Sequence, residues 1–143
     1  MRERGRGQID LPRVLIVEDF EDLRKLVAFY LGARGYQVIE AATGKAAIQA
    51  AMAGNLNLIL LDFRLPDVNS VELARELQKL LQLENTPTVG WSADSRSHRH
   101  RETLREAGIV EFLEKPIRLR DLDIIIDRFL PKSTQPLVPL AAR

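Results

Sequence analysis

Five polar side chains of this sequence each follow a short apolar run. They are Glu18 and Asp19 after residues 14–17, Asp62 after residues 58–61, Ser92 after residues 88–91 and Lys115 soon after residues 110–113. If the runs are parallel strands, their carboxyl ends meet at one edge of the sheet, where open parallel sheets bind their ligands. The spacing therefore predicts one composite site for a metal ion and an anion.

The three acids of this set favour a bound cation. Carboxylates that lie together repel one another, and a hard divalent cation relieves the repulsion; Mg²⁺ in particular takes one or two carboxylates, waters and phosphate oxygens. The hydroxyl of Ser92 and the ammonium of Lys115 both donate to anionic oxygens, which a site that only holds a metal does not require. Together, the five side chains suit a phosphoryl group bound beside Mg²⁺.

Asp62 is the candidate nucleophile among the acids. Glu18 and Asp19 are adjacent and suit a pair of metal ligands, whereas an aspartate carboxylate can itself attack phosphorus and form an acyl phosphate. Such a transfer needs chiefly positioning and neutralisation of charge. Each residue alone also has a plain structural explanation, such as a helix cap at Glu18 and Asp19 or a strand-end turn at Asp62. Only the joint arrangement of all five residues favours phosphoryl transfer over these structural explanations.

The elements that must position these residues alternate along the chain. Residues 58–61 are apolar in succession, which is typical of a strand covered on both faces. Helical spacing of apolar residues is clearest in two segments, at Leu23, Leu26, Val27, Tyr30 and Leu31 and again at Leu122, Ile125, Ile126, Phe129 and Leu130. The alternation predicts five βα units and a parallel sheet.

One further strand and three further helices complete the pattern. We expect the strand over residues 36–40 and the helices over 44–53, 70–81 and about 95–107. Thr43 begins the first of these helices, and Asn69 with Glu72 resembles a capping box at the second. The inward residues of the second helix are Leu73, Leu77, Leu80 and Leu81. The third has Leu104 and Ala107 as its apolar anchors, so we expect it to be weakly held.

Composition limits the class of protein. A chain of 143 residues forms one domain by default, and we expect a flexible tail over residues 1–12, a folded domain over 13–130 and a Pro-containing tail over 131–143. The formal net charge is +1, and the lack of cysteine excludes disulfides, thiolate zinc sites and cysteine nucleophiles. No apolar run approaches the roughly 20 residues that cross a bilayer, and no export signal is visible, so we expect a cytoplasmic protein.

An ordered set of short segments resembles the receiver domain of two-component response regulators. The segments are Glu18-Asp19 after Val-Leu-Ile-Val, Asp62-Phe-Arg-Leu-Pro-Asp, Ser92-Ala93, and Phe112-Leu-Glu-Lys115-Pro116. The resemblance covers about residues 13–130. It implies a doubly wound, flavodoxin-like (CheY-like) α/β fold with a five-stranded parallel sheet of order 2-1-3-4-5 and five helices, here as a single-domain response regulator.

The sequence departs from this family in two places. Ser70 stands where the family usually has glycine, so the turn after Asp62 is expected to differ. Trp91 is bulkier than the aliphatic residue common before the hydroxyl position, and Gly90 is expected to make room for it.

The resemblance also implies a function for each site residue. A histidine kinase or a histidine phosphotransfer protein would pass a phosphoryl group to Asp62. Mg²⁺ would be held by Asp19, Asp62, the backbone carbonyl of Arg64 and, through water, Glu18. The protein would then be a phosphoacceptor with slow autodephosphorylation rather than an enzyme.

Signalling would depend on two further positions implied by the family. Ser92 and Phe112 would couple phosphorylation to the surface formed by the fourth helix, the fifth strand and the fifth helix. That surface would bind a downstream protein effector or, when phosphorylated, a second copy of the chain. The first helix, including Phe20, Asp22, Leu23 and Lys25, would select the kinase.

Other functions fit the sequence less well. A receiver-like interaction module that works without phosphorylation remains the alternative, although the acids, Ser92 and Lys115 are all present. A hydrolase of the haloacid-dehalogenase kind needs a carboxylate two residues after the nucleophile, where this chain has Arg64. The basic stretch at 96–105, with His98 and His100, is most simply a solvated face. No helix-turn-helix is recognisable, so neither direct DNA binding nor membrane association is expected.

Overall fold

The computed structural model describes residues 11–81, 85–93 and 101–131, without the side chain of Arg101. Strands and helices alternate as β1 (Arg13–Val17), α1 (Glu21–Ala33), β2 (Gln37–Ala41), α2 (Gly44–Met52), β3 (Leu58–Asp62), α3 (Ser70–Leu80), β4 (Thr88–Ser92), α4 (Arg101–Glu106), β5 (Ile109–Glu114) and α5 (Leu119–Phe129). The strands pair in parallel in the order β2-β1-β3-β4-β5. The predicted doubly wound fold is confirmed.

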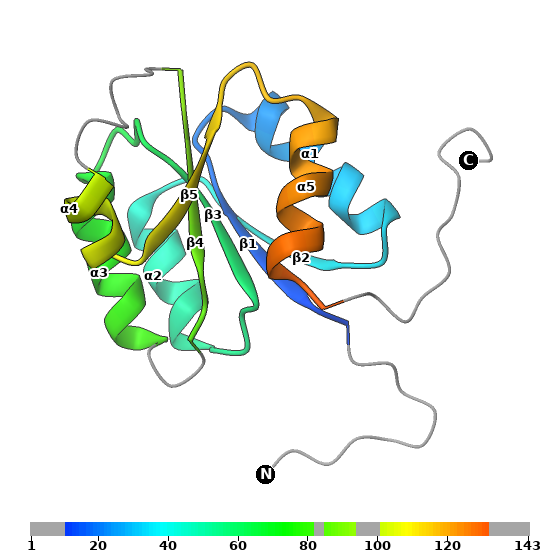
Figure 1. Ribbon diagram of the computed structural model, residues 1–143. Helices are drawn as coiled ribbons and strands as arrows, with labels where there is room; N and C mark the ends of the chain where they lie inside the picture. The colour runs from blue at the N-terminus through cyan, green and yellow to red at the C-terminus, as the bar shows by residue number, and fades with distance from the viewer. Residues whose placement is uncertain (1–10, 82–84, 94–100, 132–143) are drawn as a thin grey trace, which may run out of the picture.

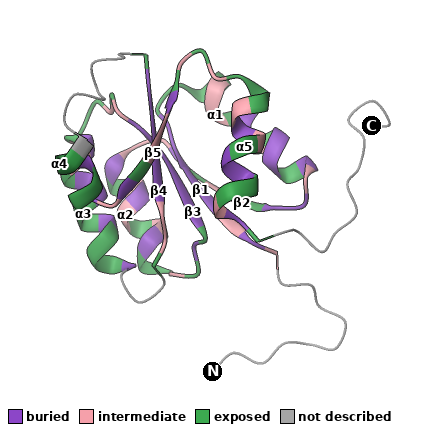
Figure 2. Ribbon diagram, viewed as in Figure 1, coloured by how far each residue is buried: buried purple, intermediate pink, exposed green. Residues whose placement is uncertain are grey.

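The sheet lies between two layers of helices (Figure 1). One face is covered by α1 and α5, and the other by α2, α3 and α4. Each face has its own apolar cluster, and the two clusters share the strands between them. The central strands are therefore buried along their length (Figure 2), and every residue of β3 is buried, including its terminal Asp62. This explains why β3 is apolar in succession rather than in alternation.

The register of the strands places the predicted site residues at one edge. Val17 lies opposite Leu61, so the chain leaves β1 at Glu18 beside the end of β3. Asp62 lies opposite Trp91, and Ser92 lies opposite Glu114 on the far side. Because all five strands run in the same direction, their carboxyl ends lie along the same edge of the sheet.

The two predicted helix caps are present. The Thr43 hydroxyl accepts a hydrogen bond from the Ala46 amide at 3.1 Å. The Asn69 side chain accepts from the amides of Val71 and Glu72 at 2.9 and 3.1 Å. Both caps satisfy amides that the first turn of a helix leaves without a partner.

Two leucines expected to face inward are instead exposed. Leu26 in α1 is 56% exposed, and Leu80 in α3 is 44% exposed. Each lies at an edge of the buried face of its helix, one position before the buried Val27 or Leu81, and successive helical residues are rotated by about 100°. The apolar stripe of each helix is thus narrower than the sequence pattern indicates.

Some predictions fall partly or wholly outside the described residues. The described part of α4 begins at Arg101, and its expected anchors Leu104 and Ala107 are both buried. The preceding segment 94–100, with His98 and His100, lies outside the described residues, as do 1–10 and 132–143. The boundaries of the two tails therefore stay predictions. No helix in the described ranges is both long and apolar enough to cross a bilayer.

Leu77 and Leu80 allow a matched test of how α3 packs. Leu77 is fully buried, whereas Leu80 is exposed on the same helix. We expect Leu77→Ala to lower the free energy of unfolding by about 2–5 kcal/mol because it leaves a cavity in the core. Leu80→Ala should lower it by less than about 1 kcal/mol. Urea unfolding followed by circular dichroism measures both, and equal losses would contradict this orientation of α3.

Candidate functional site

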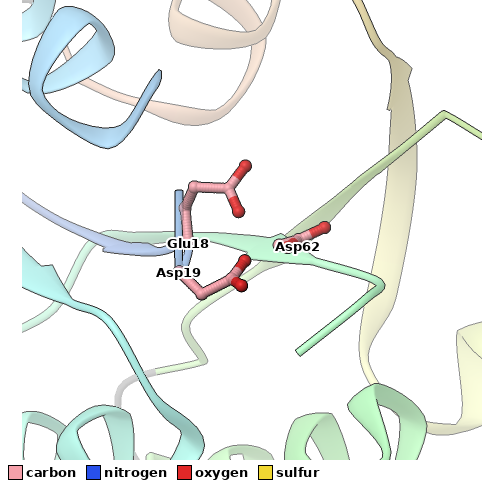
Figure 3. Close-up of side chains that lie close together, drawn as sticks. All are labelled: Glu18, Asp19 and Asp62. Carbon is pink, nitrogen blue, oxygen red and sulfur yellow. The ribbon is translucent and has the colours of Figure 1, made fainter. Parts of the chain in front are cut away.

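Three carboxylates gather beyond the ends of β1 and β3. Glu18, Asp19 and Asp62 each offer an oxygen within 4.8 Å of the others, and Figure 3 shows Asp62 at the end of β3 beside the two acids that follow β1. Glu18 and Asp62 are buried, whereas Asp19 is exposed. The cluster therefore combines two desolvated acids with one acid that faces solvent.

A simple capping role does not account for the first two acids. The N-cap of α1 is Phe20, which follows both of them, and no side chain caps that position. The Phe20 amide approaches Glu18 Oε2 only at 3.5 Å. A contact this long contributes little, so the positions of the acids call for another explanation.

Lys115, just beyond β5, contacts both buried acids. Its Nζ atom donates to Glu18 Oε1 at 2.7 Å and to Asp62 Oδ1 at 3.2 Å. The contact joins residues that are 97 and 53 positions apart in the sequence. One ammonium group thus joins three of the predicted site residues, Glu18, Asp62 and Lys115, and Asp19 lies close to the two acids.

Burial changes the proton affinity of this cluster. Burial of Glu18, with the neighbouring Asp62, raises its pKa to about 7, and Lys115 offsets this only in part. Burial opposes the charge of Lys115, but the hydrogen bond with Glu18 and the negative charges of Asp62 and Glu18 prevail and raise the pKa of Lys115. Lys115 therefore stays cationic, while one more positive charge would stabilise the ionised form of Glu18.

The backbone at Glu18 is held by its neighbours. The Glu18 amide donates to the Ala41 carbonyl at 3.0 Å, and Arg24 Nη1 donates to the Glu18 carbonyl at 3.0 Å. Arg24 also pairs with Glu40 at 3.0 Å. Sequence reasoning missed Arg24, because nothing in its spacing indicates a contact with a carbonyl six residues earlier.

A second set of hydrogen bonds holds Asp62. The Arg64 amide donates to Asp62 Oδ1 at 3.1 Å, so Arg64 begins the loop directly beside the acid. The buried Ser70 hydroxyl donates to the Asp62 carbonyl at 2.9 Å. A glycine at position 70 would have no such donor, so the departure noted in the sequence has a direct structural consequence.

Ser92 and Phe112 lie on the neighbouring strands. Ser92 is buried at the end of β4, and its carbonyl accepts from the Lys115 amide at 2.9 Å. The Phe112 ring packs edge-to-face on Phe63, with their centroids 4.8 Å apart. Phe63 directly follows Asp62, and its contact with Phe112 was not anticipated from the sequence.

Gly90 makes room for these two rings and not for Trp91. A Cβ atom at Gly90 would lie 2.7 Å from Phe112 Cε1 and 3.0 Å from Phe63 Cε1. Trp91 belongs to the apolar cluster on the opposite face of the sheet, as expected for adjacent strand residues. The sequence-based expectation that Gly90 accommodates Trp91 was wrong for this reason.

Trp91 lies close to the charged cluster. The side chain is fully buried, and Lys115 Nζ lies 5.8 Å from its ring centroid. This is within the range of a cation–π interaction. Since Trp91 is the one tryptophan of the chain, its fluorescence should be sensitive to movement of Lys115.

The donor set fits Mg²⁺. The ion takes hard oxygen ligands, commonly one or two carboxylates with waters, and Glu18, Asp19 and Asp62 supply carboxylate oxygens at short mutual distances. Burial raises the pKa of Glu18 to about 7 even with Lys115 present, so a further positive charge nearby would favour its ionised form. Asp19 is exposed, so a cation bound to it could keep water ligands on the solvent side.

Comparison with known proteins identifies the class. Residues 14–127 match the model of the response regulator receiver domain, and the chain belongs to this family. It is 26% identical to part of the CAI-1 autoinducer sensor kinase/phosphatase CqsS of Vibrio cholerae, over 81% of this chain and 16% of that protein. It is 27% identical to the transcriptional regulatory protein ResD of Bacillus subtilis, over 90% of this chain and 52% of ResD.

Solved structures support the same conclusion. The crystal structure of response regulator TrrA from Thermotoga maritima, in complex with Mg²⁺-BeF, aligns with a TM-score of 0.72 and 25% identity, over 84% of this chain and all of that chain. The alignment thus covers the whole of the TrrA chain and 84% of the present chain. The present chain spans about half of ResD and a smaller part of CqsS.

The raised pKa of Glu18 predicts a specific dependence of stability on pH. The folded chain holds this proton up to about pH 7, whereas an ordinary glutamate loses it near 4.5. Without metal, the contribution of Glu18 to stability is therefore fully present below about pH 4.5 and is lost as the pH rises through about 7. Glu18→Gln removes this dependence, which we expect to amount to about 2 kcal/mol.

The measurement is chemical unfolding in a chelating buffer at pH 5 and pH 8. Other groups also titrate in this range, so the comparison is between the pH dependence of the wild type and that of Glu18→Gln. The same loss of stability in both proteins would show that burial does not raise the pKa of Glu18.

Proposed function

We propose that this receiver domain accepts a phosphoryl group on Asp62 and transmits its state through protein contacts. The observation that carries the proposal is the contact of Lys115 with the buried Glu18 and Asp62, at 2.7 and 3.2 Å. An ammonium group beside a buried carboxylate is well placed to bind phosphoryl oxygens as they arrive. Membership of the receiver family supports the same chemistry.

Mg²⁺ would be held by Asp19, Asp62, the backbone carbonyl of Arg64 and, through water, Glu18. Held there, the ion would supply positive charge to neutralise the phosphoryl oxygens. The fit of the carboxylates to a hard cation supports this assignment, as does the Mg²⁺-BeF bound to the related TrrA.

In the transfer itself, a carboxylate oxygen of Asp62 attacks phosphorus. The new P–O bond forms as the P–N bond to a phosphohistidine breaks, and the electron pair of that bond stays on the imidazole nitrogen. Lys115 would donate to the phosphoryl oxygens, and the Ser92 hydroxyl would donate to another of them. The donor would be a histidine kinase or a histidine phosphotransfer protein, whose choice would depend on α1 beside the site.

Slow autodephosphorylation would end the signal. Water must reach phosphorus in line with the Asp62 oxygen, and the exposed Arg64 stands two residues after Asp62, where it can influence that approach. Asp94, which stands two residues after Ser92 in the sequence, lies outside the described residues. We therefore assign the chain the role of a phosphoacceptor and not that of a turnover enzyme.

The signal would pass to the α4-β5-α5 surface. Ser92 ends β4, and Phe112 belongs to β5, so a shift of Ser92 toward the phosphoryl group would act on adjacent strands. The partner would be a protein effector or a second phosphorylated copy, and no direct contact with DNA is proposed. We place these events in the cytoplasm, where phosphoryl donors charged from ATP are available.

The first test is incubation with Mg²⁺ and acetyl phosphate, followed by measurement of intact mass. We expect one added phosphoryl group on the wild type and none on Asp62→Asn or in chelator, because the acceptor oxygen and the cation are both required. Rapid quenching in acid slows hydrolysis of an unstable acyl phosphate, so that it can still be detected by its mass.

The opposite outcome would favour the phosphorylation-independent interaction module. If neither an adduct nor release of phosphate depends on Asp62, the domain does not act as a phosphoacceptor. Release of phosphate without a visible adduct would instead show that the acyl phosphate forms and is short-lived.

Trp91 fluorescence provides a separate test of metal binding. Mg²⁺ entering beside Asp62 would compete with Lys115 for the carboxylates and change its distance from the Trp91 ring, now 5.8 Å. We expect a saturable change in emission as Mg²⁺ is added. In Asp19→Asn the affinity for Mg²⁺ should fall by at least about tenfold, because a charged ligand is lost. An unchanged titration in Asp19→Asn would remove Asp19 from the proposed ligand set.

A further inference from the structure

The loop between β3 and α3 is tied to a helix from another part of the fold. Asp67 lies in the middle of this loop, and its Oδ1 accepts from the Gly44 amide at 3.0 Å. Its Oδ2 lies 3.4 Å from the Lys45 amide. One carboxylate thus spans the first two amides of α2, across 23 positions of sequence.

The backbone of α2 approaches the loop closely at the same place. A Cβ atom at Gly44 would lie 2.4 Å from Val68 Cγ1 and 3.5 Å from Asp67 Oδ2. Val68 is β-branched and has little rotamer freedom to withdraw. Glycine at position 44 is therefore what allows the loop to lie against the start of α2.

Asp67 is not needed merely to begin this helix. Thr43 is the N-cap of α2, and its hydroxyl already accepts from the Ala46 amide at 3.1 Å. A carboxylate is favourable near a helix N-terminus, but this one comes from the loop and not from the helix itself. The contact therefore constrains the loop as well as the first turn of the helix.

The loop is also fixed at both of its ends. At its start, the Phe63 amide donates to the Trp91 carbonyl at 2.9 Å, and the Arg64 amide donates to Asp62 Oδ1. At its end, Asn69 caps α3, and Ser70 donates to the Asp62 carbonyl. Asp67 adds a third attachment point between them, three residues after Arg64.

From this arrangement we propose that Asp67 is a positioning residue for the metal site. By holding the loop against α2, its carboxylate keeps the backbone carbonyl of Arg64 where a cation bound by Asp19 and Asp62 can use it. The inference rests on the proposed Mg²⁺ site and adds a residue that would not touch the ion. Residues that orient metal ligands commonly change affinity by 10–100-fold when they are replaced.

The test compares two caps of the same helix by calorimetric titration of the full chain with Mg²⁺. Asp67→Ala should weaken Mg²⁺ binding by about tenfold. Thr43→Ala also removes an acceptor from the first turn of α2 but does not release the loop, so its affinity should change by less than about twofold. Thermal unfolding without metal shows whether the two variants destabilise the protein to a similar extent.

Two further variants separate position from charge. Asp67→Asn keeps an oxygen that can accept from the Gly44 amide, so it should restore most of the affinity lost in Asp67→Ala. Gly44→Ala keeps Asp67 but forces a methyl group against Val68, so it should weaken binding even though alanine favours a helix more than glycine does.

The outcomes are distinct. The inference is overturned if Thr43→Ala weakens binding as much as Asp67→Ala, since general loosening of α2 would then be the cause. It is also overturned if Asp67→Asn binds as weakly as Asp67→Ala, because charge alone would then explain the effect, or if Asp67→Ala binds normally. If the wild type itself binds no Mg²⁺, the proposed metal site fails and this inference fails with it.

Discussion

The contact of one ammonium group with two buried carboxylates is the constraint on which the rest of the site depends. Glu18 directly follows β1, Asp62 ends the adjacent β3, and both side chains are withdrawn from water. Without a cation, burial would favour the protonated forms of these acids, because a buried charge needs a partner. Lys115 supplies that partner from beyond β5, while burial still raises the pKa of Glu18 to about 7. A further positive charge at the site would therefore favour the ionised form of Glu18.

The parallel sheet is what makes this arrangement possible. It places the ends of β1, β3, β4 and β5 side by side, so that polar residues at the carboxyl ends share one edge while the apolar residues before them remain in the core. The site also has aromatic neighbours on both faces of the sheet. Trp91 lies near Lys115 on one face, and Phe63 contacts Phe112 on the other. Packed side chains therefore lie next to the site on both faces of the sheet, and a change in charge at Asp62 can act on neighbouring elements through them.

Exposed apolar residues next to the site are relevant to its partners. Phe20, Leu26 and Phe29 on or beside α1 are all more than half exposed. Phe20 was among the residues expected to select the kinase, and its exposure beside Asp19 is compatible with that role. Segments similar to this chain occur within a sensor kinase/phosphatase and within a transcriptional regulatory protein. Exposed apolar residues of this kind are positions at which a protein partner can make contact.

The sequence by itself determined the fold class and the candidate site. Successive apolar residues in β3 and helical spacing in α1 and α5 predict buried parallel strands between helices, and this order alone places Glu18, Asp19, Asp62, Ser92 and Lys115 at the strand ends. These are consequences of local periodicity and chain direction, which a sequence displays directly. Predicting that these residues lie at the strand ends does not require knowing which side chains contact one another.

Only the tertiary structure decided what holds those residues in place. The partners of Asp67 and Arg24 are backbone groups, the Gly44 amide and the Glu18 carbonyl, and every residue has such groups, so no pattern in the sequence marks them. The space at Gly90 is filled by Phe63 and Phe112 and not by Trp91, because adjacent strand residues face opposite layers. Leu26 and Leu80 belong to apolar patterns yet are exposed, since the width of the buried stripe depends on what packs against the helix. Each of these outcomes depends on contacts between distant segments, which form only when the chain folds.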